Sequence, residues 1–351
     1  MRAAQLSIGR NEIEGPLRGY HHETYVFPLP DGIGLGQGRW KCREPRSNLL
    51  WFDRRCFVSE EQLLKALAGH IERIPDVFDV DSTGLQRFVE GQTLGSLYTF
   101  GEALPEPILD QIVLLFEQLV RVAPETITVE RRCVEEDRPA DGDTNGFLDR
   151  LIHFTEEQVY KKNRRRFGEL FQDLGVDNSV FPRLRKRTVR LSGRPFCLLH
   201  ADLHRENFII DPQQQLWTID WELAMVGDPL YDLATHLFLM QYPDEQSKWV
   251  QKLWAEVVEH IRPGSSAGMA EDLPLLMDYK RAQSVFTDVI REAMSLVSGP
   301  DIDTELAQAG WKLHEILTVA ADPLDLSSVP SQEDITAALD RWRRDDSQAK
   351  G

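Results

Sequence analysis

The stretch that decides the fold of this chain runs from Leu198 to Ala234 and reads LLHADLHRENFIIDPQQQLWTIDWELAMVGDPLYDLA. Short apolar runs bounded by polar residues are typical of buried strands. Two such runs are expected, one at Pro195–His200, which leads into this stretch, and one at Leu216–Ile219, with a loop between them. Polar side chains with oxygen atoms follow both runs, so the pattern predicts a hairpin that presents them on one side.

Three of these side chains are Asp202 and Asn207 in the loop and Asp220 at the end of the second strand. Phosphoryl transfer needs a carboxylate at the acceptor hydroxyl and hard oxygen ligands for Mg²⁺. One such residue alone would be ordinary in a turn, but the ordered set predicts a phosphotransferase site. A zinc hydrolase built on His200, Asp202 and His204 is disfavoured, because zinc needs further His or Cys ligands and Asp220 would then have no role.

The blocks HADLHREN and IDWELAMVGDPLYDLA resemble the aminoglycoside phosphotransferase and choline kinase family of small-molecule kinases. This resemblance implies an α+β, bilobal, protein-kinase-like fold. Residues 1–90 would form a small β-rich nucleotide-binding lobe, and residues 91–351 a larger α-helical lobe for catalysis and acceptor binding. It also implies ATP or GTP as co-substrate, with Mg²⁺. Ala201 departs from the family pattern, which usually has Gly at this position.

The resemblance assigns a role to each polar residue of these blocks. Asp202 would be the catalytic carboxylate, and Asn207 and Asp220 the magnesium ligands. His200 would brace the loop by hydrogen bonds. His204 stands where protein kinases have a lysine near the γ-phosphate, and both a phosphate contact and an ordinary loop role stay open. Three further acids would support the structure around the site: Glu222, Asp228 and Asp232.

The first lobe carries a weaker part of the same resemblance. Gly19, in LRGYHHETY, would belong to a short glycine-containing nucleotide loop. In the later strand Arg39–Arg46, alternation puts Arg39, Lys41 and Arg43 on one face. The family uses one basic residue here to hold the α- and β-phosphates. The Arg-x-Pro ending favours Arg43 and the usual preference for lysine favours Lys41, while exposed basic residues also protect sheet edges.

Two other segments of this lobe have counterparts in the family. Glu60, or else its neighbour Glu61, would be the ion-pair partner of the basic residue, although first-turn acids also complement a helix dipole. The segment Gln86–Gly91 resembles the linker whose backbone binds the adenine edge. Phe88 and Glu90 are therefore candidate nucleotide-binding residues.

Periodicity along the rest of the chain predicts strands first and helices afterwards. Strands at Glu23–Leu29 and Gly38–Pro45 are expected to form a hairpin around a Gly-rich turn. Helices are expected at Ser59–Ile71, Pro107–Val122 and Phe147–Leu174, and over most of the chain after Leu230.

Composition excludes several classes of protein. With 40 basic and 57 acidic residues the chain has a net charge of −17, which opposes general binding to nucleic acid. No apolar run approaches the roughly 18 residues of a membrane span, and the first residues lack the apolar core of a secretory signal. The four cysteines lie far apart, as expected for reduced thiols in the cytoplasm. The oligomeric state stays open.

Charge is unevenly distributed along the chain. Residues 161–190 hold ten basic and three acidic residues, a net charge of +7. A solvated helix face is the favoured explanation, and an anion-binding surface is the alternative. Residues 222–351 hold 23 acids and 11 bases, a net charge of −12. Such a field favours a cationic acceptor.

The sequence therefore predicts an enzyme that moves the γ-phosphoryl group of ATP or GTP to a hydroxyl of a small molecule. An antibiotic or similar polyhydroxyl compound is the expected acceptor, with antibiotic resistance as the expected role. The alternatives are a housekeeping kinase for a sugar, amino alcohol or nucleoside, and a catalytically silent kinase-like binding protein. Protein kinases are disfavoured, because no Ala-Pro-Glu follows Asp220.

Overall fold

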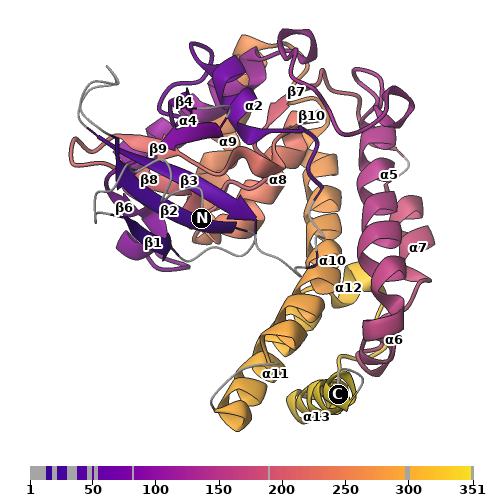
Figure 1. The fold of residues 1–351 in the computed structure, drawn as a ribbon. Helices are drawn as coiled ribbons and strands as arrows, with labels where there is room; N and C mark the ends of the chain where they lie inside the picture. The colour runs from indigo at the N-terminus through magenta and orange to yellow at the C-terminus, as the bar shows by residue number, and fades with distance from the viewer. Residues whose placement is uncertain are drawn as a thin grey trace. The chain divides into compact units, whose positions relative to one another are not determined.

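The computed structural model describes most of the chain, namely residues 13–17, 22–29, 38–45, 50, 54–80, 83–188, 190–296 and 301–348. The chain forms two compact units (Figure 1). The first comprises Met1–Val134 and Pro195–Ser266, and the second Glu135–Arg194 and Ala267–Gly351. The predicted lobe boundary at Gly91 lies inside the first unit and stays a prediction.

The first unit begins with an antiparallel sheet of five strands in the order β1-β2-β3-β5-β4. Its strands are β1 (Glu14–Leu17), β2 (His22–Pro28), β3 (Arg39–Pro45), β4 (Val77–Val80) and β5 (Thr83–Arg87). Strands β2 and β3 pair along their whole length, so the predicted hairpin is confirmed. Its Gly-rich turn, residues 30–37, lies outside the described residues.

Alternation gives β3 two different faces. Trp40 and Cys42 are buried with Tyr25, Phe27 and Leu85 in a hydrophobic core on one face of the sheet. Because successive strand residues point to opposite faces, Arg39, Lys41 and Arg43 project from the other face. The sheet thus holds a row of three basic side chains away from its apolar core.

Helix α2 (Glu60–Leu67) follows this hairpin and is the helix predicted after Ser59. The Ser59 side chain caps it by accepting the backbone N–H of Gln62 at 3.2 Å. The helix buries its three leucines, as their spacing predicts, and ends four residues earlier than expected. The cap places Glu60 in the first turn.

Short strands carry the deciding stretch of sequence. They are β6 (Gln92–Thr93), β7 (Cys197–Leu199), β8 (Phe208–Ile210), β9 (Leu216–Thr218) and β10 (Met225–Gly227). The predicted hairpin between the strands near residues 195–200 and 216–219 is wrong. Strand β7 pairs with β10, and β9 pairs with the unpredicted β8. The turn between β8 and β9 is much shorter, and Asp211 stabilises it by accepting the N–H groups of Gln213 and Gln215 at 2.8 Å.

Four helices complete the first unit: α3 (Leu94–Leu97), α4 (Glu106–Arg121), α8 (Pro229–Met240) and α9 (Asp244–Ile261). Asp228 caps α8 by accepting the N–H of Leu230, and most of α8 is buried. The sequence did not predict the break before α9. There Gln241 takes a left-handed conformation, with φ 49°, two residues before Pro243.

The second unit is helical in its described residues (Figure 1). Its helices are α5 (Thr144–Phe154), a π-helical segment (Thr155–Lys161), α6 (Lys162–Asp173), α7 (Val180–Arg187), α10 (Met269–Ser295), α11 (Ile302–Val319), α12 (Ala321–Leu324) and α13 (Gln332–Gln348). Tyr160, Phe171, Phe181 and Phe286 form its aromatic core, with ring centroids 4.9–5.7 Å apart. The predicted α+β class is confirmed. Among the described helices, none is both long and apolar enough to cross a membrane.

Candidate active site

The loop between β7 and β8 is held in place by one carboxylate of α8. Asp232 accepts the backbone N–H of His200 at 3.1 Å and that of Ala201 at 2.7 Å. Ala201 has φ 65°, in the left-handed region that glycine adopts most easily. The backbone therefore explains why a glycine is expected here, and the two hydrogen bonds keep the conformation with alanine.

His200 is fully buried under this loop. Its Nε2 lies 3.1 Å from the carbonyl oxygen of Ile219, and its ring packs on Trp221. Burial lowers the pKa of His200 to about 4, so the imidazole is neutral at pH 7. A neutral ring can donate Nε2–H to Ile219, which ties the loop to the segment that carries Asp220.

Asp202 lies at the centre of the loop with two polar neighbours. The Asn207 side chain donates through Nδ2 to the backbone oxygen of Asp202 at 2.9 Å and to its Oδ2 at 3.1 Å. Nε2 of His204 lies 3.4 Å from the same Oδ2. Both contacts fall on one carboxylate oxygen, so Oδ1 remains for another group.

Asp220 stands beside this loop. The N–H of Ile219 donates to the backbone oxygen of Asn207 at 3.0 Å, which brings the two segments together. Asp220 has φ 65°, and 42% of its side chain is exposed. The structure thus brings Asp202, Asn207 and Asp220 into one region, although through β7–β10 and β8–β9 pairing instead of the predicted hairpin.

Glu60 joins three parts of the unit. Its Oε2 accepts Nη1 of Arg43 at 2.6 Å and Nε2 of Gln86 at 2.8 Å, and its Oε1 accepts the backbone N–H of Trp221 at 2.8 Å. Of the two predicted alternatives, Glu60 makes the contact with Arg43, whereas Glu61 binds Ser59 on its own helix. Helix α2, strand β3 and the segment after Asp220 therefore meet at one carboxylate.

Glu222 is a second carboxylate that binds several segments of the unit. The sequence predicted only that it would support the structure around the site. Nη1 of Arg43 donates to its Oε1 at 2.6 Å, Nδ1 of His22 lies 3.0 Å from the same atom, and Arg55 pairs with Oε2. Burial acts to raise the pKa of Glu222, but His22, Arg43 and Arg55 outweigh it and lower the pKa to about 2. The only sequence signal for Glu222 was its position directly after Asp220 and Trp221. Its partners could not be predicted, because they lie far away in the sequence.

The model of the phosphotransferase enzyme family matches residues 19–271 of the 351 residues. The match includes every candidate site residue named above. The chain belongs to the phosphotransferase enzyme family. It is an ATP-dependent small-molecule kinase, and the predicted family and protein-kinase-like fold are confirmed.

The chain also resembles several solved structures. The chain is 16% identical to macrolide 2′-phosphotransferase MphH from Brachybacterium faecium, with 91% of this chain and 93% of that chain covered and a TM-score of 0.49. It is 14% identical to APH(2″)-IIa in its gentamicin complex, covering 95% and 96%, with a TM-score of 0.49. For a choline/ethanolamine kinase family protein from Mesorhizobium loti the identity is 15%, the coverage 98% of each chain, and the TM-score 0.48.

The linker of this phosphotransferase contacts the first residue of β3. The N–H of Phe88 donates to the backbone oxygen of Arg39 at 2.9 Å, and the Arg39 guanidinium lies 4.6 Å from the centre of the Phe88 ring. Arg39 also binds both carboxylate oxygens of Glu90 at 2.7 Å. A side chain at Gly91 would collide with the backbone of Ile210, since a Cβ would lie 2.3 Å from its oxygen. Gly19 lies outside the described residues.

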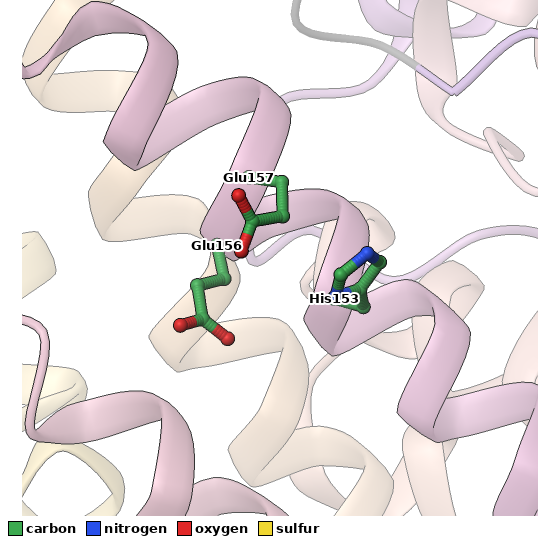
Figure 2. Close-up of side chains that lie close together, drawn as sticks. All are labelled: His153, Glu156 and Glu157. Carbon is green, nitrogen blue, oxygen red and sulfur yellow. The ribbon is translucent and has the colours of Figure 1, made fainter.

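Another group of potential metal ligands lies in the second unit of the kinase. His153, Glu156 and Glu157 come from neighbouring turns of one helical segment (Figure 2). Both carboxylates already have cationic partners. Lys161 lies 2.7 Å from each glutamate, and Arg185 lies 2.7 Å from Glu156. This group therefore has the composition of an ion-pair network instead of an open metal site.

Proposed function

We propose that this kinase transfers the γ-phosphoryl group of ATP to a hydroxyl of an antibiotic or similar polyhydroxyl compound, with Mg²⁺, and serves in antibiotic resistance in the cytoplasm. The observation that carries the proposal is the convergence of Asp202, Asn207 and Asp220 on one region of a phosphotransferase fold. All four cysteines are thiols and not disulfides in the structure, which agrees with a reducing compartment.

Asp202 is the proposed catalytic residue. With Oδ2 engaged by Asn207 and His204, its Oδ1 is the oxygen that would accept the hydrogen bond of the acceptor hydroxyl. This contact orients the hydroxyl toward the γ-phosphorus. The carboxylate would take up the hydroxyl proton as the new P–O bond forms and the bond from the γ-phosphorus to the leaving ADP breaks. In this arrangement His204 holds the Asp202 carboxylate from its Oδ2 side, and a contact with the phosphate is the alternative role of His204.

The residues present fit a magnesium site. The Asn207 amide uses its Nδ2 to bind Asp202, which leaves Oδ1 as the atom for a hard cation. Asp220 offers a carboxylate that is 42% exposed. One Asp and one Asn with nucleotide phosphates are a sufficient set for Mg²⁺, which keeps several waters. When bound, the ion would neutralise phosphate charge; Asn207 and Asp220 would hold it.

The acceptor side of the proposal rests on charge. Residues 222–351 have a net charge of −12, which favours a cationic polyhydroxyl acceptor through electrostatic attraction. We therefore expect kcat/KM for the acceptor to fall as the ionic strength rises, because salt screens such fields.

A panel of hydroxyl compounds tests the proposal directly. Purified enzyme with Mg-ATP is assayed for ADP release against aminoglycosides, macrolides, sugars, amino alcohols and nucleosides, with and without EDTA. Rapid turnover with an antibiotic supports the proposal, whereas turnover with only a metabolite supports the housekeeping alternative. Binding of nucleotide without turnover on any acceptor would overturn the proposed activity and support a silent binding protein.

Asp202→Ala is the sharpest variant for the mechanism. We expect kcat to fall about 10²–10⁴-fold, because the hydroxyl loses its proton acceptor and its orientation. Thermal stability should change little, since the carboxylate is partly exposed. Asp211→Ala, in the β8–β9 turn, is the matched control and should keep kcat. Wild-type turnover by the Asp202 variant would contradict the assignment.

A further inference from the structure

Arg205 lies in the middle of the loop between β7 and β8, and its role is still open. It begins a short 3₁₀ turn, in which the N–H of Asn207 donates to the backbone oxygen of His204 at 2.9 Å. The Asn207 side chain closes the same loop on Asp202. The position of Arg205 therefore determines where Asp202 and Asn207 lie.

The side chain of Arg205 is buried inside the first unit. It is 1% exposed, and it forms no ion pair with the residues that the structure describes. A guanidinium stays charged when it is buried, and its burial is costly unless its N–H groups have acceptors. The surroundings of Arg205 must therefore offer several oxygens in the right places.

Three backbone oxygens supply these acceptors. Nε of Arg205 donates to the oxygen of Met240 at 3.1 Å. Its Nη1 donates to Tyr98 at 3.3 Å, and its Nη2 donates to Glu102 at 3.0 Å. Met240 is the last residue of α8, where carbonyl oxygens lack partners within the helix and favour a cation. The planar fork of a guanidinium reaches all three oxygens at once, whereas the ammonium of a lysine is a single point of charge.

Two of these oxygens belong to residues 98–104, a segment that continues from the linker. Only β6 and α3 separate this segment from the linker. The N–H of Gly101 donates to the backbone oxygen of Gln241, at the end of α8, at 3.1 Å. The side chain of Gln246 on α9 binds both the N–H and the oxygen of Leu104 at 2.8 Å. Residues 98–104 are thus fixed to two helices, and Arg205 ties the loop to them.

A second buried side chain holds the loop on the other side of His204. Nδ1 of His236, in α8, lies 3.1 Å from the backbone oxygen of Leu203. Leu203 and Arg205 are the two neighbours of His204, whose Nε2 lies 3.4 Å from the Asp202 carboxylate. The backbone is therefore anchored on both sides of the residue that contacts Asp202.

We propose that Arg205 is a positioning residue for phosphoryl transfer. By fastening the loop to residues 98–104 and to the end of α8, it holds Asp202 and Asn207 in place against a nucleotide at the linker. The inference rests on the proposed function, since it takes Asp202 as the catalytic residue. The guanidinium is occupied by backbone oxygens, so it acts through the loop. Because transfer depends on alignment, loss of this anchor should lower the rate and not the affinity for the nucleotide.

Arg205→Lys and Arg205→Met test the anchor in two steps. Lysine keeps the charge and loses the fork, whereas methionine loses both. ADP release from Mg-ATP is measured with the best acceptor of the hydroxyl panel, or with water as the acceptor, and ADP affinity is measured by calorimetric titration. We expect kcat to fall about tenfold in Arg205→Lys and about a hundredfold in Arg205→Met. KM for ATP and the affinity for ADP should stay within about threefold of the wild type.

Phe171→Leu is the control for a loss of stability alone. Phe171 packs on Tyr160 and Phe286 in the aromatic core of the second unit. The variant should melt at a lower temperature, because it loses packing, and should keep kcat when all proteins are assayed well below their melting temperatures. Retained ADP affinity shows that each variant is folded. If Arg205→Met fails to fold, Arg205→Lys decides the test, because its ammonium still satisfies part of the buried oxygens.

Three results would contradict the inference while the wild type turns over ATP. Wild-type kcat in Arg205→Lys, with a lower melting temperature, would make Arg205 a purely structural residue. A higher KM for ATP with an unchanged kcat would place its effect on nucleotide binding. An equal fall of kcat in Phe171→Leu would assign the loss to stability. A wild type that binds no ADP and turns over no ATP would instead overturn the proposed function, and the inference with it, so the two failures are distinguished.

Discussion

Ala201 shows how a single residue can depart from a pattern without losing the conformation that the pattern serves. At φ 65° an alanine is strained by about 1–2 kcal/mol relative to a right-handed conformation. Two hydrogen bonds to Asp232 hold it there. The site therefore keeps its loop at a cost that glycine would avoid.

The strain at Ala201 can be measured with glycine. We expect Ala201→Gly to change the free energy of unfolding by less than about 1 kcal/mol, because relief of the left-handed strain offsets the extra entropy of the unfolded chain. Ala234→Gly, at a buried position inside α8, should cost about 1–2 kcal/mol, since no strain is relieved there. Urea denaturation measures both. Equal losses in the two variants would contradict the strain at Ala201.

At the scale of elements, α8 supports the loop between β7 and β8 that carries Asp202. Its first turn carries Pro229, is capped by Asp228, and directs Asp232 toward two backbone N–H groups. The loop and Asp202 are thus positioned by a rigid, buried helix. This arrangement suits a mechanism in which orientation supplies much of the rate.

Asp232→Asn tests this support. The amide keeps one acceptor oxygen, but its NH₂ would face a backbone N–H, so one buried donor is left unsatisfied. We expect a loss of about 1–3 kcal/mol in stability and a fall in kcat of about tenfold or more, with a smaller change in KM for ATP. Asp244→Asn, the same change at an exposed position in α9, should alter neither. A wild-type kcat in Asp232→Asn would show that the loop keeps its conformation without the Asp232 carboxylate.

At the scale of the whole molecule, ion pairs neutralise many of the positive charges that are concentrated between positions 161 and 190. Five of the ten basic residues between positions 161 and 190 pair with carboxylates of the second unit. Arg166, for example, binds both oxygens of Asp346 at 2.7 and 2.9 Å. These contacts favour the interpretation of the basic cluster as a solvated helix face over that of an anion-binding surface. They also leave fewer cations there for an anionic partner.

Buried histidines predict how the stability of the kinase depends on pH. Burial lowers the pKa of His200 to about 4 and that of His236 to about 3, both below the value of about 6.5 in an unfolded chain. Below pH 6.5 the two histidines therefore bind protons in the unfolded chain but not in the folded protein. The contribution of these histidines to the free energy of unfolding is complete above pH 6.5. As the pH drops toward 4, each histidine should lower that free energy by about 1.4 kcal/mol per pH unit.

His236→Gln measures one of these contributions. The variant should be less stable at pH 7, because Leu203 and Tyr242 lose their imidazole partner, but its stability should fall less steeply between pH 6.5 and 4. His70→Gln, at an exposed position, should keep the slope of the wild type. Urea denaturation at a series of pH values gives the slopes. An unchanged slope in His236→Gln would contradict the prediction.

The parts of the fold and of the site that could be predicted from the sequence are those that depend on residues close together in the chain. Two strand segments flanking a Gly-rich turn predicted the β2–β3 hairpin, and a Ser cap with leucine spacing predicted α2. One contiguous stretch contained Asp202, Asn207 and Asp220. The pairing of β7 with β10 was not predictable in the same way. Several short apolar strands can pair in more than one order, and loop length together with packing selects among them.

The sequence by itself determined the family, the chemistry and the three oxygen-bearing residues, because these depend on residue types at fixed spacing. Only the tertiary structure decided which charges meet. Arg43 and Glu222 are 179 positions apart, yet they share a hydrogen bond of 2.6 Å. Lys41, two residues from Arg43, is buried and forms no ion pair with the residues that the structure describes. Spacing cannot distinguish two basic residues on the same strand face, because their difference lies in burial and in carboxylates brought from other segments.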